Sequence, residues 1–167
     1  MSTMLHPMYT LVNLALLVWG LLVWRRTRRF STFVIVAVTF GLVYDNGILA
    51  IGNLLGRGRL LHGLSVPRFV LHQLMLPWVI WTAFQQVRRV GHPWAQGRTP
   101  GRLITLLCVV VVILGVLTRI VPMDLQLVQM DGVNRYVDEG TVGPPIVSIV
   151  SVGFAGVMGV FLWRKNR

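Results

Sequence analysis

Acidic side chains are scarce in this chain. It has 5 Asp and Glu residues among 167, against 16 Lys and Arg residues, and charged residues of either sign make up 13%. A soluble domain carries about 25% charged residues, so this composition argues against a soluble globular protein. The acidic residues gather after position 120 with one exception, Asp45, which lies inside a long apolar stretch.

Cysteine occurs once, as Cys108. A single cysteine excludes an intrachain disulfide and a thiolate metal cluster. No HxxxH or HExxH pair is formed by the four histidines, which are His6, His62, His72 and His92. Zinc needs several ligands in a fixed geometry, and a haem held by two histidines inside the membrane would need a second buried histidine. We therefore predict no metal site and no cofactor.

Long apolar runs make up most of the sequence. Hydrophobic residues are 54% of the chain, and the runs approach the roughly 20 residues that a membrane-spanning helix requires. We predict an all-α membrane protein with a single polytopic domain over residues 1–167. It would be a bundle of five transmembrane helices, at about residues 5–24, 32–51, 67–87, 103–121 and 145–163. Pro77 predicts a kink in the third span, because proline removes a helix hydrogen bond.

The basic residues are divided unequally between the two ends of these spans. Eleven of them follow spans one, three and five, and the other five lie at the opposite end. Positively charged loops stay in the cytoplasm, so we predict an outside N-terminus, an inside C-terminus and a multi-pass location in the plasma (inner) membrane. The basic clusters then contact anionic membrane lipids. The chain has no soluble basic face for nucleic acid, so we expect no nucleic-acid partner.

Asp45 is the acidic residue that needs an explanation. An ionisable side chain in a transmembrane helix is costly and usually faces the protein interior or an aqueous cavity. At 1.5 Å per residue, Asp45 lies about 9 Å below the outer end of span two, and His72 lies about 7 Å below that of span three. Arg68 and Arg119 are near the outer ends of their spans. We predict one polar layer in the outer leaflet half, where Asp45 pairs with Arg68 or Arg119.

The stretch Gly52–Val66 is too short to cross a membrane and too apolar for an ordinary solvated loop. We predict an interfacial or re-entrant segment that lies over the polar layer. Arg57 and Arg59, with the glycines beside them, would present charge and backbone N–H groups to an anion. Ser65 and Pro67 are expected as the cap and first-turn proline of span three.

The segment that begins at Leu125 reads LQLVQMDGVNRYVDEG. Its Asp131-Gly132 pair is a type I′ turn signal between two runs of β-like composition. We predict a short outer β-hairpin between spans four and five. A hairpin of two strands is marginally stable alone, so it should rest on the helix ends, either as a lid over the polar layer or as a structural plug.

The polar layer suggests a binding pocket for a lipid headgroup or an amphipathic small molecule. Its predicted ligand-binding residues are Asp45, Asn46, Arg57, Arg59, Arg68, His72 and Arg119. If the protein is an enzyme, Asp45 and His72 are the acid–base candidates. The sequence has neither a nucleophile elbow nor a phosphate-binding P-loop, so it leaves catalysis undecided.

Two alternatives explain the same features without a ligand pocket. The first is a non-catalytic subunit or assembly factor of a larger membrane complex, in which Asp45 is structural. Its contact with a membrane-protein partner, or with further copies in a homo-oligomer, would use the small-xxx-small spacing of Ser151, Ala155 and Gly159. The second alternative is an oligomeric transport component.

Overall fold

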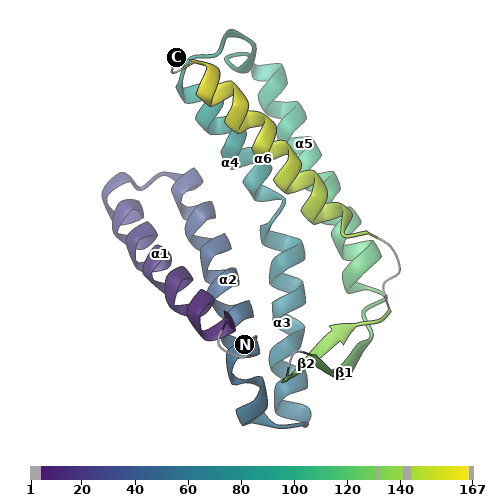
Figure 1. Ribbon diagram of the computed structural model, residues 1–167. Helices are drawn as coiled ribbons and strands as arrows, with labels where there is room; N and C mark the ends of the chain where they lie inside the picture. Colours follow the sequence, from purple (N-terminus) through teal and green to yellow (C-terminus); the bar gives the residue numbers. More distant parts are fainter. Residues whose placement is uncertain (1–4, 131, 141–143, 166–167) are drawn as a thin grey trace.

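The computed structural model describes residues 5–130, 132–140 and 144–165, which form a helical bundle with one β-hairpin (Figure 1). In this part of the chain, four helices are long and apolar enough to cross a membrane, namely Leu5–Thr27, Phe30–Leu55, Arg98–Ile120 and Ile146–Arg164. The prediction of a mostly helical, multi-pass membrane protein with a short hairpin is therefore confirmed.

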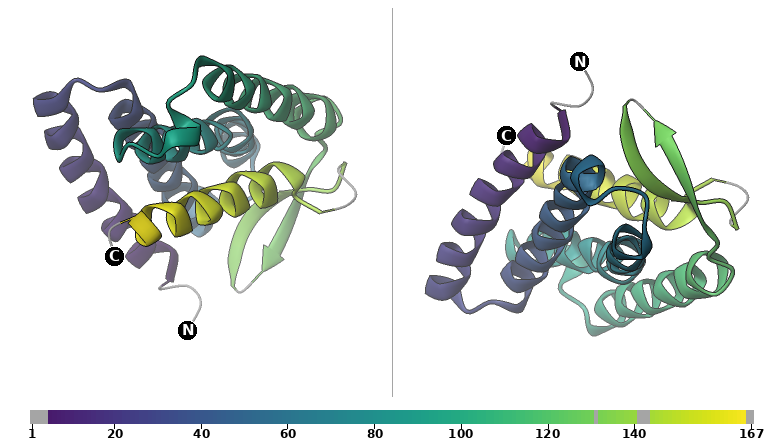
Figure 2. Two further views of the ribbon diagram at one scale, coloured as in Figure 1. Left: turned by 90° about the horizontal axis from the view of Figure 1, so that it is seen from above. Right: turned by 90° about the horizontal axis from the view of Figure 1, so that it is seen from below.

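Helices α1 (Leu5–Thr27) and α2 (Phe30–Leu55) form an antiparallel pair at one side of the bundle (Figures 1 and 2). The turn between them contains Arg28, whose φ of 51° is in the left-handed region. Helix α1 has no buried residue among those described, and Leu11 and Trp19 are 67% and 66% exposed. An apolar helix with this much exposed surface is unfavourable in water and suits a hydrocarbon environment.

The third predicted span is divided into two helices, α3 (Arg59–Met75) and α4 (Trp78–Arg89), which follow each other along the bundle (Figure 1). Proline cannot donate a helix hydrogen bond, and Pro77 lies where α3 ends and α4 begins. The predicted kink is present. The prediction of a single helix over 67–87 is wrong in two respects. Helix α3 begins eight residues earlier, and the helix is interrupted after Met75.

The predicted segment Gly52–Val66 is not a separate element between two spans. Helix α2 continues to Leu55, the connection is 56–58, and α3 starts at Arg59. Leu61 is 1% exposed, whereas Leu54 and Leu60 are 86% and 61% exposed, so the leucines of this stretch are divided between buried and exposed positions of two helices. Ser65 does not cap α3, since its hydroxyl donates to the Leu61 carbonyl at 2.7 Å, and Pro67 lies inside the helix.

The C-terminal half begins with a short 3-10 turn, η2 (Pro93–Ala95), and α5 (Arg98–Gly115). Helix α5 continues as a π-helical turn, η3 (Val116–Ile120), before strands β1 (Leu125–Met130) and β2 (Val133–Asp138). The strands are antiparallel, with Leu127 opposite Tyr136. Gly132 has a φ of 77°, as its place in the predicted turn requires, and Asp131 lies outside the described residues.

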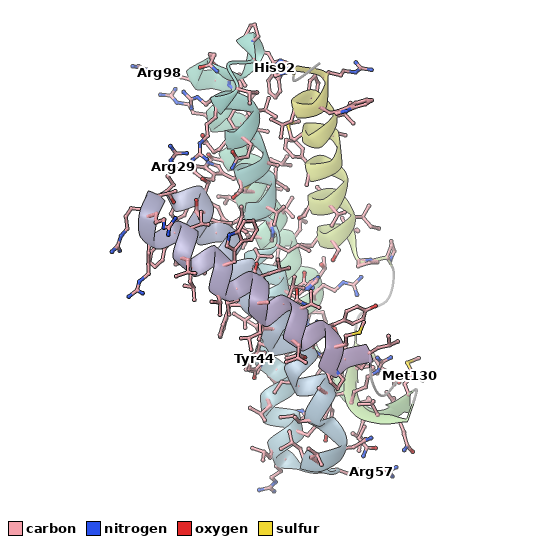
Figure 3. The ribbon with its side chains drawn as sticks, turned by 60° about the vertical axis from the view of Figure 1, so that its left-hand side comes forward. Arg29, Tyr44, Arg57, His92, Arg98 and Met130 are labelled. Atoms are coloured by element: carbon pink, nitrogen blue, oxygen red, sulfur yellow. The ribbon has the colours of Figure 1, made fainter. Side chains whose placement is uncertain are left out.

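Helix α6 (Ile146–Lys165) packs against α4 and α5. The buried core joins these helices in two clusters, one around Ile80, Cys108 and Val147 and the other around Phe84 and Met158. In Figure 3, His92 and Arg98 lie at one end of the bundle, and Arg57 and Met130 lie at the opposite end with the hairpin. These ends are called the basic end and the hairpin end below.

Candidate functional site

Asp45 of α2 pairs with Arg68 of α3. The Nε atom of Arg68 donates to Oδ1 of Asp45 at 2.5 Å, and the two side chains are 11% and 39% exposed, respectively. The guanidinium group of Arg68 also lies over the ring of Phe69, with 4.8 Å from Cζ to the ring centroid. Of the two partners expected for Asp45, the structure selects Arg68.

One turn further along α3, the same helix face carries His72. Its Nε2 atom is hydrogen-bonded to the Ser148 hydroxyl of α6 at 3.0 Å. Side chains four residues apart on a helix are neighbours, so Arg68 and His72 face the same space between α2, α3 and α6. The pairs Asp45–Arg68 and His72–Ser148 thus connect three helices along one polar line.

A cavity of about 420 Å³ opens beside this polar line. Its wall is formed by α2, α3, η3, β2 and the start of α6 through Asp45, Arg68, Phe69, His72, Gln73, Arg119, Arg135, Val137, Asp138, Pro145 and Ser148. Three of these residues are arginines and two are aspartates, so positive charge is in excess even with a neutral His72. We call this the polar cavity.

Arg119 reaches the polar cavity from the π-helical turn η3, and its Nη2 atom donates to the Pro144 carbonyl at 2.6 Å. Arg135 reaches it from β2, in the middle of a strand whose Val133 is 5% exposed. Alternate residues of a strand share a face, so Val133, Arg135 and Val137 all point toward the helices. The hairpin is therefore a wall of the cavity.

Several polar atoms of this wall have no partner among the described residues. Arg68 Nη1, Arg135 Nε and Gln73 Oε1 are buried, and no described group is within hydrogen-bonding reach. Buried polar groups are usually paired, because an unpaired group costs about 1–3 kcal/mol. Two arginines and one glutamine of the cavity wall thus each have a buried polar atom without a described hydrogen-bond partner.

A second, apolar cavity of about 80 Å³ adjoins the polar cavity between α2 and α3. It shares Asp45, Arg68 and His72 with the polar cavity, and its other walls are mainly apolar, namely Val38, Gly41, Leu42, Leu71, Met75 and Leu76. We call it the apolar slot. The shared residues mean that a molecule in the polar cavity has an apolar surface directly beside it.

The hairpin is held over the cavity by close contacts with α2. Asn53 donates through Nδ2 to the Gly132 carbonyl at 2.6 Å and accepts at Oδ1 from the Asn134 backbone N–H at 2.7 Å. A side chain at Gly52 would collide with the Asn134 carbonyl oxygen, so glycine is required for this approach. The hairpin also contacts α3 through Tyr136, whose ring meets His62 edge-on at 5.0 Å.

The structure brings four of the predicted site residues together in the cavity wall: Asp45, Arg68, His72 and Arg119. The other three lie elsewhere. Asn46 donates to the Leu42 carbonyl of its own helix at 3.0 Å. Arg57 contacts Gln129 Oε1 at 3.4 Å at the hairpin end, and Arg59 is the first residue of α3.

Sequence reasoning missed Arg135, Gln73 and Ser148 as wall residues. The signal for Arg135 is its alternation with Val133 and Val137, which favours an inward-facing arginine in a strand. Gln73 follows His72 and faces Gly115 of α5, where an added Cβ would lie 3.2 Å from its Oε1. This contact between distant segments has no local signal in the sequence.

The small residues of α6 do not share one exposed face. Ser151 is fully buried, Ala155 is half-buried and Gly159 is exposed. A Cβ added at Gly159 would meet nothing within 4 Å. At its Ser151 end, this stripe therefore packs inside the chain.

Comparisons with protein-family models, with curated proteins and with solved structures find no match for this chain.

Proposed function

We propose that the protein spans the plasma membrane five times and binds an anionic amphipathic molecule, such as a lipid with a negatively charged headgroup, in the polar cavity. Helices α3 and α4 together would form the third span, with the N-terminus outside and the C-terminus inside. The eleven basic residues assigned to the cytoplasmic side support this orientation. It places the polar cavity in the outer leaflet half.

The observation that carries the proposal is the convergence of Arg68, Arg119 and Arg135 on one cavity. Arginine presents a planar fork of donors that fits phosphate and carboxylate groups, and Arg68 and Arg135 each have a buried nitrogen without a described partner. The adjoining apolar slot would hold the start of an apolar tail. The charged polar cavity and the adjoining apolar slot together suit a molecule with a charged headgroup and an apolar tail.

The test is stabilisation by a defined lipid. Purified protein in mild detergent is titrated with phosphatidylglycerol or with zwitterionic phosphatidylcholine, and the midpoint temperature of unfolding is measured. We expect the anionic lipid to raise the midpoint more, because a ligand of the native state shifts unfolding by mass action. Arg135→Gln should weaken phosphatidylglycerol binding about tenfold, which is about 1.4 kcal/mol.

The matched control is Arg59→Gln, which removes the same charge from an exposed helix start outside the cavity wall. Binding that falls equally in both variants would reflect surface charge alone and would contradict the proposal. A Ser148→Phe variant places a larger side chain in the cavity without a change of charge. It should also weaken phosphatidylglycerol binding.

A further inference from the structure

A second arginine-lined cavity lies at the basic end of the bundle, between α4 and α5. Its volume is about 440 Å³, and the residues of its wall come from these two helices only. Helix α4 contributes Trp81, Gln85 and Arg88, and helix α5 contributes Arg98, Gly101, Arg102 and Thr105. No residue of this wall belongs to the polar cavity or the apolar slot, so it is a separate site, which we call the α4–α5 cleft.

The cleft follows from the helical spacing of its residues. Positions 81, 85 and 88 fall on one face of α4, and positions 98, 101, 102 and 105 fall on one face of α5. The helices are antiparallel neighbours (Figure 1), so Arg88 lies at the level of Arg98, whereas Trp81 and Thr105 lie about 10 Å further along the bundle. The cleft is thus charged toward the basic end of the bundle and less polar at its other end.

Positive charge in the cleft is not compensated by the protein. The acidic residues of the described part are Asp45, Asp124, Asp138 and Glu139, and none of them lies in the cleft wall. Within the described ranges, the side chains of Arg98 and Arg102 form no hydrogen bond or ion pair, and both are exposed. Three guanidinium groups in one cleft favour a bound anion.

Three contacts hold residues of the cleft wall in place. Gln96 donates through Nε2 to the Arg88 carbonyl at 2.6 Å, and Arg88 Nη2 contacts the Gln96 carbonyl at 3.5 Å. At the other end of the cleft, the ring of Trp81 meets Phe30 of α2 edge-on at 5.3 Å between centroids. An added Cβ at Gly101 would lie 3.7 Å from Arg88 Nη1, so a large side chain at this position would occupy space next to the Arg88 guanidinium group.

We propose that the α4–α5 cleft binds the phosphate group of an anionic phospholipid. Arginine forks match phosphate oxygens, and basic pockets between transmembrane helices suit phospholipid headgroups. Beyond Thr105, the same face of α5 continues with Val109, which is 41% exposed. A lipid with its phosphate in the cleft would lay an acyl chain against this apolar surface. A free phosphate ion would gain nothing from this valine.

The experiment measures lipid bound to the purified full-length chain by native mass spectrometry in mild detergent. The probes are phosphatidic acid, phosphatidylcholine and inorganic phosphate, each added alone. We expect phosphatidic acid to bind to the wild-type chain at least about tenfold more tightly than phosphatidylcholine. The double variant Arg98→Gln/Arg102→Gln should lose about tenfold or more of that affinity.

The control variant Arg26→Gln/Arg29→Gln removes the same charge from exposed positions outside the cleft, and it should keep the affinity. Gly101→Leu should block the cleft without a change of charge, whereas Gly153→Leu adds the same side chain to an open surface of α6 and should bind as wild type. Equal losses in the site and control variants would overturn the proposal.

The two phosphate sources are separated by the inorganic phosphate arm. In one outcome, millimolar inorganic phosphate displaces phosphatidic acid from the wild-type chain but not from Arg98→Gln/Arg102→Gln. This result would show that the headgroup phosphate alone is recognised. No competition would show that the acyl chains contribute. Phosphatidic acid can also enter the polar cavity, so the cleft is measured in an Arg135→Gln background, in which only the other cavity is altered. Arg98→Gln/Arg102→Gln should still lose phosphatidic acid affinity in that background, so failure at one site is distinguishable from failure at the other.

Discussion

The Asp45 carboxylate of α2 accepts a hydrogen bond from Arg68 Nε of α3 at 2.5 Å. This pair joins two helices that follow each other in the chain through the short connection 56–58. Its members are unequally buried, since the Arg68 side chain is 11% exposed and the Asp45 side chain is 39% exposed. The Nε atom of Arg68 is hydrogen-bonded in this pair, whereas its buried Nη1 atom has no hydrogen-bond partner among the described residues.

Removal of the Asp45 charge should destabilise the protein. In Asp45→Asn the buried Arg68 loses its counter-charge, and we expect the free energy of unfolding to fall by about 1–3 kcal/mol, between the values for surface and buried pairs. The double variant Asp45→Asn/Arg68→Gln should recover part of this loss, because it leaves no unpaired charge. Denaturation of the detergent-solubilised variants measures both effects, and a double variant weaker than either single one would contradict this explanation.

The hydrogen bond between His72 and Ser148 should couple α3 to α6. Each single substitution, His72→Ala or Ser148→Ala, should lower the free energy of unfolding by about 1 kcal/mol. In a double-mutant cycle the coupling should be about 0.5–1.5 kcal/mol. A control cycle pairs His72→Ala with Ser31→Ala, since Ser31 binds Arg89 rather than His72. Coupling of equal size in both cycles would show that the measurement does not report this contact.

Gly52→Ala should displace the hairpin, because the added methyl group would collide with the Asn134 carbonyl oxygen. We expect a loss of about 1–3 kcal/mol, typical of overpacking, and faster amide hydrogen exchange in β1 and β2. Gly41→Ala is the control, since a Cβ there meets nothing within 4 Å. Unchanged exchange in Gly52→Ala would mean that the hairpin is not seated on α2.

The proposed topology can be checked with single cysteines in a Cys108→Ala background. Arg57→Cys, at the hairpin end, should react in intact cells with a maleimide that does not cross membranes. Gln96→Cys, at the basic end, should react only after the membrane is opened. Both positions are exposed, so the difference reports membrane side rather than burial. The reverse pattern would invert the orientation, and equal labelling would contradict a membrane between the two ends.

The main features of the fold could be predicted from local patterns. Four helices are visible as apolar runs of sufficient length, and the hairpin is visible as two β-like runs around Gly132. Asp45, Arg68, His72 and Arg119 could be predicted to lie together because helix rise places each of them at a similar distance from the end of its predicted span. All four line the polar cavity.

Other features depend on contacts that local patterns do not contain. The stretch Gly52–Val66 is too short for a membrane span and too apolar for an ordinary loop, and its division between the end of α2 and the start of α3 at Arg59 is not visible in the sequence. The π-helical turn that carries Arg119 has no sequence signature. Gln73 belongs to the cavity only because α3 approaches Gly115 of α5. Tertiary packing decided each of these points.

The central claim is that the polar cavity holds an anionic amphipathic molecule. The most direct measurement is photo-crosslinking with a phosphatidylglycerol that carries a diazirine close to its headgroup, followed by peptide mass spectrometry. Adducts should concentrate on residues 68–73 of α3 and 135–138 of β2, exceed those of a matched phosphatidylcholine probe, and fall in Arg135→Gln but not in Arg59→Gln. Adducts spread evenly over the exposed faces of α1 and α5, with no difference between probes or variants, would contradict the claim.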